Sequence, residues 1–393
     1  MIRILTGNVF DVLPTLPDRS VQSCITSPPY WGLRDYGVPG QLGLEKTPQE
    51  YVTNLVAVFR EVRRVLRDDG VLWLNLGDSF ASGKGTCYNP GGGENSLGQE
   101  RKAAGAHPLD RGNKSTLSAV GLKPKDLVGI PWRVAFALQD DGWWLRSDII
   151  WSKPNPMPES VTDRPTKAHE YIFLLAKSQR YYWDQEAVRE PIKPGNNGHI
   201  RGRARTANGA LGGENQHHME DRHYAEIKGA QIRTVWTIAT HPYSGAHFAT
   251  FPPALVEPMV KASTSERGCC PKCGKPWERV VERKPSNPWQ ERVAAGAKSG
   301  SLERGHNENH GEGMSHDLYV NTTTLSWRPG CSCDAGEPVP CVVLDCFGGA
   351  GTTGLVASRL GRDAVLIELN PEYAEMARRR IYEDAPLLNR GAK

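Results

Sequence analysis

A glycine-rich stretch at residues 345–354, Asp-Cys-Phe-Gly-Gly-Ala-Gly-Thr-Thr-Gly, restricts the possible folds more than any other segment. It follows the apolar run 342–344 and precedes a helix-forming stretch at 353–360, so it is predicted to form the turn of a strand–turn–helix unit. Glycines in such a turn let a ligand approach the backbone, and the start of the helix offers unpaired N–H groups. The turn lacks the lysine of a phosphate-binding loop, so ATP is not the expected ligand.

Acidic residues end the predicted strands on both sides of this turn. Asp345 ends the first strand, and Glu368 ends the apolar run that follows the helix. An acid at the second position can accept both hydroxyls of a ribose, and the helix start favours a carboxylate ligand. An adenosine that carries an amino-acid tail fits all these features, and S-adenosylmethionine is such a molecule. The alternative is a structural turn with an ordinary surface glutamate.

Short apolar runs alternate with helical patterns along most of the chain. The strand–helix–strand order favours a mostly parallel sheet. The glycine-rich segment 81–121 interrupts this order and is predicted to be a long loop. Strands are predicted at residues 2–5, 21–25, 71–76, 144–151, 169–176, 232–238, 342–345 and 364–368, and helices at 9–16, 48–66, 124–140, 251–263, 353–360 and 371–383.

A second motif, Ser27-Pro28-Pro29-Tyr30, follows the predicted strand 21–25. Two consecutive prolines cannot continue a strand, and the second keeps the residue before it extended, so a stiff loop is expected at the carboxyl end of that strand. This edge of an open α/β sheet is where ligands bind. A hydroxyl, a proline carbonyl and an aromatic ring together can hold a planar group that carries an amino substituent. A simple proline turn is the alternative.

The bulk composition is compatible with a large intracellular protein. The chain has 393 residues and a net charge of +4, which permits a polyanionic partner without requiring one. No signal-peptide core and no apolar run of membrane-spanning length is visible, so a cytoplasmic protein without membrane contact is expected. In a reducing compartment, paired cysteines bind metals more often than they form disulfides.

Two cysteine pairs predict a metal site. Cys270 and Cys273 form a Cys-x-x-Cys turn followed by glycine, and Cys331 and Cys333 follow after a polar, glycine-rich stretch. Four thiolates suit a tetrahedral structural zinc. The alternatives are unliganded thiols, or Cys269 in place of one ligand; the histidines at 306, 310 and 316 are weaker candidates.

These motifs together resemble those of the amino-group DNA methyltransferases. Ser27 to Tyr30 resembles their catalytic motif, the stretch 345–353 their S-adenosylmethionine motif, and Glu368 the acid that follows it. Here the catalytic motif precedes the cofactor motif, which resembles the permuted β order of that family. Weaker likenesses are Gly7-Asn8 to the strand end that meets the adenine ring, residues 247–253 to the helix start before the cofactor motif, and residues 149–155 and 169–170 to later catalytic motifs.

The resemblance implies a fold, a reaction and a set of residues. The fold is the Rossmann-like fold of S-adenosylmethionine-dependent methyltransferases: a mostly parallel, seven-stranded sheet with helices on both faces, here with long loop insertions and a zinc-knuckle insertion. The reaction is methyl transfer to an exocyclic amino group of a base flipped out of double-stranded DNA. The catalytic residues would be Ser27, Pro28, Pro29 and Tyr30, and the cofactor-binding residues Asn8, Phe251, Asp345, Phe347, Gly348, Gly349, Gly351, Thr352, Thr353 and Glu368.

Serine at the first catalytic position is more typical of N4-cytosine enzymes, whereas aspartate or asparagine is more typical of N6-adenine enzymes. Ser27 therefore favours cytosine, with adenine N6 as the alternative. RNA or protein amide methyltransferases usually place a similar loop after the cofactor motif, and a non-catalytic zinc-containing DNA-binding protein would not need an intact loop and turn. A separate restriction endonuclease is a further expected partner.

The expected organisation has five parts. Residues 1–184 form the catalytic half with the loop insertion 81–121, and residues 185–240 form the target-recognition region. Residues 241–265 and 340–384 form the cofactor-binding half. Residues 266–335 form a four-cysteine zinc-knuckle insertion, and residues 385–393 form a tail.

Overall fold

The computed structural model describes residues 1–81, 87–88, 121–191, 228–240, 251–285, 320–334 and 336–384. Most of the predicted loop 81–121, residues 247–250, the three histidines and the tail 385–393 lie outside these residues. The chain divides into two compact units. The larger unit comprises Met1–Asp184, Arg233–Glu278 and Pro329–Lys393, and the smaller unit comprises Gln185–Ile232 and Arg279–Arg328.

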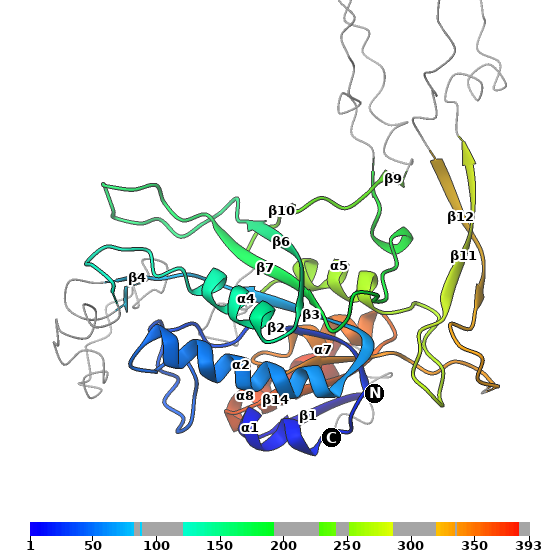
Figure 1. The fold of residues 1–393 in the computed structure, drawn as a ribbon, viewed down its shortest axis with the longest axis horizontal. Coiled ribbons are helices and arrows are strands. Elements are labelled where there is room, and N and C mark those ends of the chain that lie inside the picture. The colour runs from blue at the N-terminus through cyan, green and yellow to red at the C-terminus, as the bar shows by residue number, and fades with distance from the viewer. Residues whose placement is uncertain are drawn as a thin grey trace, which may run out of the picture. The chain divides into compact units, whose positions relative to one another are not determined.

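A single large sheet forms the centre of the larger unit (Figure 1). Only β7 runs antiparallel to its neighbours, so the predicted mostly parallel sheet is confirmed. The predicted number of seven strands is wrong, because β10 pairs with the outer strand β6 and makes the sheet eight-stranded within the described residues. The strand order is β1 (Ile2–Thr6), β14 (Asp363–Glu368), β13 (Val342–Asp345), β2 (Val21–Thr26), β3 (Leu66–Leu76), β7 (His169–Ala176), β6 (Trp144–Ser152) and β10 (Val235–Thr237).

Successive side chains of the central strands point to opposite faces of the sheet. In β3, Leu72 and Leu74 belong to the core beneath α2 (Pro48–Val65) and α4 (Ile130–Asp140). Trp73 points to the other face, where its indole N–H donates to Ser263 at the end of α5 (Pro253–Ser263). Because the side chains alternate and helices cover both faces, the side chains on both faces of the sheet are buried. The other helices within the described ranges are α1 (Val9–Val12), the 3₁₀ turns η1 (Leu13–Thr15) and η3 (Glu186–Val188), α7 (Thr352–Arg359) and α8 (Pro371–Asp384).

Two elements begin five or more residues from the predicted position. The helix predicted from residue 124 begins at Ile130, because the backbone at Gly129 is left-handed and the Asp78 carboxylate accepts hydrogen bonds from the N–H groups of Gly129 and Ile130. The strand predicted from residue 71 begins at Leu66, which pairs with Val21 of β2.

The smaller unit contains two short two-stranded sheets in its described part. One pairs β8 (Glu190–Pro191) with β9 (Lys228–Ala230), and the other pairs β11 (Glu278–Pro285) with β12 (Val320–Arg328). In the second sheet the Arg279 guanidinium lies 4.3 Å from the centre of the Trp327 ring. A further pair, β4 (Phe80–Ala81) and β5 (Cys87–Tyr88), belongs to the larger unit.

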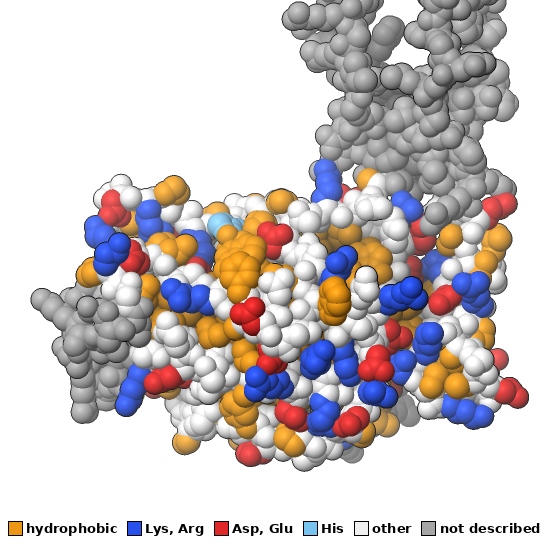
Figure 2. All heavy atoms as spheres, in the orientation of Figure 1, with side chains coloured by type: hydrophobic (Ala, Val, Ile, Leu, Met, Phe, Trp, Pro, Cys, Tyr) orange, Lys and Arg blue, Asp and Glu red, His pale blue; other side chains and the backbone are white. Residues whose placement is uncertain are grey.

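Basic and acidic side chains are interspersed on the face that Figure 2 shows, and no continuous basic strip crosses its described part. No helix in the described ranges has the length and apolar character needed to cross a membrane.

Candidate active site

The carboxyl ends of the central strands open into a cavity of about 790 Å³. It lies where the strand order reverses. From β13 the chain continues to β14 on one side, and from β2 it continues to β3 on the other side. Ligands bind at such switch points in open α/β sheets. Eleven of the residues predicted from sequence line this cavity: Asn8, Ser27, Pro28, Pro29, Tyr30, Phe251, Phe347, Gly348, Gly349, Thr352 and Glu368. Asp345, Gly351 and Thr353 do not line it.

The loop after β2 is anchored from behind. The Tyr51 hydroxyl of α2 donates to the Pro29 carbonyl at 2.8 Å, and the Trp31 indole N–H donates to the Glu45 carbonyl at 2.8 Å. Within the described residues, no donor forms a hydrogen bond with the Pro28 carbonyl. The loop thus holds the Ser27 hydroxyl and one free carbonyl at a fixed place on the cavity wall.

The Tyr30 hydroxyl is the centre of a half-buried hydrogen-bond network. It donates to Glu170 Oε2 at 2.7 Å and accepts from Asn75 Nδ2 at 2.9 Å. Ser27 Oγ donates to the same hydroxyl at 3.4 Å, and Lys153 forms an ion pair with Glu170. Burial, followed by the nearby Glu170 charge, raises the pKa of Tyr30 well above its usual value. Tyr30 is therefore a neutral phenol at physiological pH.

The Tyr30 ring also fits against a residue that has no side chain. A Cβ built on Gly77 would lie only 2.4 Å from Tyr30 Cε2. Gly77 does not have a positive φ. A glycine at this position therefore allows the Tyr30 ring to approach the backbone closely and is not required by the backbone conformation.

Asp345 holds the glycine turn from inside the protein. Its side chain is 1% exposed, and its two oxygens accept hydrogen bonds from the hydroxyls of Thr26 and Thr353, both at 2.7 Å. The Phe347 N–H adds a third bond at 3.1 Å. Burial raises the pKa of Asp345, and these donors oppose that shift. Asp345 thereby joins the end of β2, one residue before Ser27, to the cofactor turn, but it does not reach the cavity itself.

Glu368 lies at the end of β14 and faces the cavity. Its oxygens accept from the N–H groups of Gly349 at 2.7 Å and Asn370 at 2.9 Å. Each carboxylate oxygen has a second lone pair for a ligand hydroxyl. Burial raises the pKa of Glu368.

The glycines of the turn have distinct steric roles. Gly351 has a φ of +73° at the start of α7, and an added Cβ would lie 2.8 Å from Ala377 Cβ. Gly349, Gly351 and Gly354 also have the Gly-x-Gly-x-x-Gly spacing of dinucleotide-binding turns, which is a further sequence signal for a nucleotide-like ligand.

Asn8 has a structural role that its sequence position did not reveal. Its side-chain oxygen accepts from the Phe10 N–H at 3.0 Å and caps α1, and its amide donates to the Gly40 carbonyl at 3.3 Å. Only an amide can make both bonds, since a carboxylate has no donor.

Several polar side chains in the cavity were missed by the motif predictions. The missed residues are Asn75 near the end of β3, Asp78 just after it, and Lys167, which precedes β7. Lys153 also lines the cavity, but it lies inside the stretch 149–155 that resembles a catalytic motif. Lys167 donates to the Asp78 carbonyl at 3.1 Å, and burial lowers the pKa of Lys167. The available signals were a polar residue within the otherwise apolar end of a strand for Asn75 and an acidic residue two positions after that strand for Asp78.

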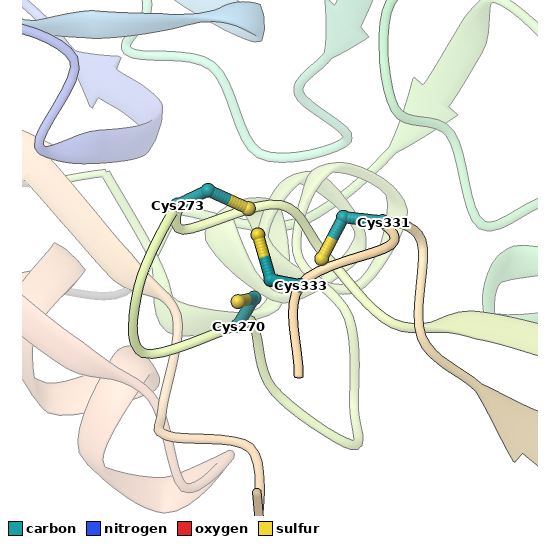
Figure 3. Close-up of side chains that lie close together, drawn as sticks. All are labelled: Cys270, Cys273, Cys331 and Cys333. Carbon is teal, nitrogen blue, oxygen red and sulfur yellow. The ribbon is translucent and has the colours of Figure 1, made fainter. Parts of the chain in front are cut away.

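The four predicted metal-ligating cysteines come together in the larger unit. Their sulfur atoms lie within 4.8 Å of one another, and the four side chains come from two loops (Figure 3). Sulfurs around a tetrahedral zinc would be about 3.8 Å apart, because each Zn–S bond is about 2.3 Å. Cys269 is not part of the cluster; its sulfur accepts from Gln22 Nε2 at 3.5 Å.

Backbone contacts hold the two cysteine loops together. Cys269 and Val339 exchange backbone hydrogen bonds of 2.8 and 2.9 Å. Gly268 and Gly330 allow close approach, since an added Cβ would meet the carbonyl oxygens of Val339 at 2.3 Å and Pro276 at 2.2 Å.

Comparison with known proteins identifies the family. The family model described as DNA methylase, of the N6/N4 type, matches residues 21–270 and 338–379. The chain belongs to this N6/N4 DNA methylase family. It is 38% identical to the type II methyltransferase M.XycI of Xanthomonas campestris pv. cyanopsidis and 37% identical to M.Cfr9I of Citrobacter freundii, over 96% of this chain and 87% of each relative.

A solved structure supports the fold alone. The PvuII DNA methyltransferase, described as cytosine-N4-specific, has a TM-score of 0.51 and 15% identity over 98% of this chain and 91% of that one. The family model and the two relatives confirm the family resemblance inferred from the motifs.

Proposed function

We propose that this N6/N4 DNA methylase transfers a methyl group from S-adenosylmethionine to the N4 amino group of cytosine in double-stranded DNA. The observation that carries this proposal is the shared cavity. Ser27 and the free Pro28 carbonyl line the same space as Gly348, Gly349 and Glu368. The choice of cytosine over adenine N6 rests on Ser27 alone, and adenine N6 is the second candidate.

The fixed loop suits the chemistry of an exocyclic amino group. Its nitrogen is a weak nucleophile, because the lone pair is delocalised into the ring. Ser27 Oγ and the Pro28 carbonyl would accept the two amino hydrogens and direct the lone pair toward the methyl donor. Tyr30 would stack on the flipped base. The protein would accelerate this direct displacement mainly by positioning.

The opposite wall has the groups that S-adenosylmethionine requires. When bound, this molecule supplies a methyl group on a positively charged sulfur. Glu368 would accept the ribose hydroxyls, and Thr352 at the positive start of α7 would face the carboxylate of S-adenosylmethionine. Phe251, Phe347 and Asn8 would surround the adenine. Asp345, Gly351 and Thr353 would shape the turn without touching the ligand, since they do not line the cavity.

Cys270, Cys273, Cys331 and Cys333 would hold a structural zinc ion. The cluster joins segments that lie on either side of Arg279–Arg328 in the chain. It is also tied to the sheet: Arg67 donates to the Cys273 carbonyl, and Gln22 Nε2 donates to the Gly274 carbonyl at 3.0 Å. A closed four-thiolate site leaves no open position for catalysis.

The remaining expectations concern the partners and the location. Residues 185–240 would recognise the target sequence, and the cytoplasm would be the location. Because the similar relatives M.XycI and M.Cfr9I are named as type II methyltransferases, a separate restriction endonuclease is a proposed partner.

Identification of the methylated base tests the proposal. Unmethylated genomic DNA is incubated with the protein and methyl-labelled S-adenosylmethionine, digested to nucleosides and separated by chromatography with mass detection. We expect label in N4-methyldeoxycytidine. Label in N6-methyldeoxyadenosine would contradict the cytosine assignment, and no labelled nucleoside from folded protein would contradict the proposed reaction.

A further inference from the structure

A chain of hydrogen-bonded groups leads away from the proposed site of the target base. Ser27 Oγ donates to the Tyr30 hydroxyl at 3.4 Å, and that hydroxyl donates to Glu170 Oε2 at 2.7 Å. Because the Ser27 hydrogen is directed toward Tyr30, the Ser27 lone pairs remain available to a donor in the cavity. Glu170 is the first group along this chain that can take up a proton and keep it.

Methyl transfer to an amino nitrogen requires a proton acceptor. The nitrogen forms its bond to the methyl carbon while the carbon–sulfur bond breaks and its electron pair goes to sulfur. The nitrogen is then positively charged and must lose a proton. Of its two proposed acceptors, the Pro28 carbonyl has no proton to pass on, whereas the Ser27 hydroxyl has one.

We propose that Ser27, Tyr30 and Glu170 form a proton relay that removes this proton. As the N–H bond breaks, Ser27 Oγ takes the proton and gives its own to the Tyr30 oxygen, which gives its own to Glu170 Oε2. Ser27 and Tyr30 end unchanged, and the Glu170 carboxylate ends as a neutral acid. This relay rests on the proposed methyl transfer and holds equally for cytosine and adenine.

The surroundings of Glu170 suit a proton acceptor at the end of the chain. Asn75 Nδ2 donates to the Tyr30 hydroxyl and, at 2.8 Å, to Glu170 Oε2, so it fixes both oxygens. The charged and titratable groups that face Glu170 are Lys153, which pairs with Oε1, and Lys167, His169 and Tyr30. Since the raised pKa of Tyr30 keeps its hydroxyl neutral, Tyr30 can pass a proton but does not retain a phenolate.

The first test is the single-turnover rate of Glu170→Gln. We expect a fall of about 10²- to 10⁴-fold, the usual contribution of a positioned acid or base, with unchanged affinity for S-adenosylmethionine and DNA. The matched control is Glu61→Gln, which changes an exposed carboxylate on α2 that pairs with Arg64. A Glu170→Gln protein with at least half of the wild-type rate overturns the relay.

The second test separates proton uptake from charge pairing. In Glu170→Ala, acetate, fluoroacetate and difluoroacetate can enter the vacated space with similar size and equal charge, but their basicity falls in that order. The relay predicts that the restored rate falls in the same order and that acetamide restores nothing. Equal restoration by the three carboxylates, or restoration by acetamide, means that Glu170 only holds Tyr30 in place and overturns the relay.

If the Glu170 variants do not fold, Tyr30→Phe still tests the relay. It removes the relay oxygen and keeps the ring, so the relay predicts a loss as large as that of Glu170→Gln. A nearly unchanged rate for Tyr30→Phe overturns it. Wild-type activity on DNA is measured in parallel, and its absence would refute the proposed methyl transfer and not the relay alone.

Discussion

Gly77 gives a sharp test of how the Tyr30 ring is placed. In Gly77→Ala the new Cβ would start 2.4 Å from Tyr30 Cε2 and 2.8 Å from Cδ2. Carbon atoms in favourable contact are about 3.5–4.0 Å apart, so the ring must move by about 1 Å. The backbone at this glycine does not have positive φ, so the substitution adds no backbone strain of its own.

A shift of about 1 Å in a catalytic group can cost roughly 10²-fold in rate, which corresponds to about 2.7 kcal/mol in the activation barrier. The shift would also disturb the hydrogen bonds from the Tyr30 hydroxyl to Glu170 and from Asn75. We therefore expect a single-turnover rate roughly 10²-fold below wild type for Gly77→Ala. Because Gly77 is remote from the glycine turn in the chain and contacts the tyrosine, the affinity for S-adenosylmethionine should stay within about twofold.

The assay pairs single-turnover methyl transfer with calorimetric binding of S-adenosylmethionine. The matched control is Gly361→Ala, where φ is +71° and no atom lies within 4 Å of the added Cβ. This control strains the backbone by roughly 1–3 kcal/mol but touches nothing in the cavity, so it should lower stability and leave the rate unchanged. A Gly77→Ala protein with the wild-type rate would refute the reasoning that the position of Tyr30 limits the reaction.

Three further predictions concern the cofactor turn and the cysteines. Asp345→Asn should lower the free energy of unfolding in urea by about 2 kcal/mol, since hydrogen bonds to a buried charge contribute about 1.5–3 kcal/mol each; an unchanged midpoint would contradict this. Because burial raises the pKa of Glu368, its carboxylate should become protonated at a higher pH than an ordinary glutamate, so the dissociation constant of S-adenosylmethionine should rise as pH falls. Glu368→Gln should bind about tenfold more weakly or worse and lose this pH dependence, whereas equal pH dependence of the affinity in wild type and Glu368→Gln would contradict the role. Purified protein should contain one zinc ion per chain by mass spectrometry. The zinc ion should be lost in Cys331→Ser and kept in Cys269→Ser. Loss of zinc in both variants, or in neither, would contradict the proposed ligand set.

The positions of strands and turns could be predicted because their signals are local. The glycines of the turn, the two prolines after β2 and the acids at strand ends all stand next to the apolar runs that they terminate. The cysteine spacing predicted a cluster whose members lie on two loops far apart in the chain, and the structure brings them within 4.8 Å.

The network around Tyr30 could not be predicted, because it depends on strand register. Asn75 of β3 stands opposite Ile172 of β7, which puts Glu170, two residues away, on the same face of the sheet. A shift of one residue would turn these side chains to opposite faces. The start of α4 was missed for a similar reason, since its cap is the Asp78 carboxylate from a distant part of the chain.

The hydrogen-bond partners of Asp345 could also not be predicted from the motif. Its strand-end position indicates a ligand contact, but three internal donors occupy its oxygens. Burial of a carboxylate requires such partners, and only the three-dimensional arrangement shows that they come from β2, the turn and α7.

The division of the cavity into a catalytic wall and a cofactor wall is tested most directly by one variant, Ser27→Ala, in two measurements on the same sample. The account predicts that S-adenosylmethionine binds with wild-type affinity, while the single-turnover rate of methyl transfer to DNA falls by roughly 10²-fold or more. An unchanged rate would contradict the catalytic role of the loop, and a lost affinity for S-adenosylmethionine would contradict the separation of the two walls.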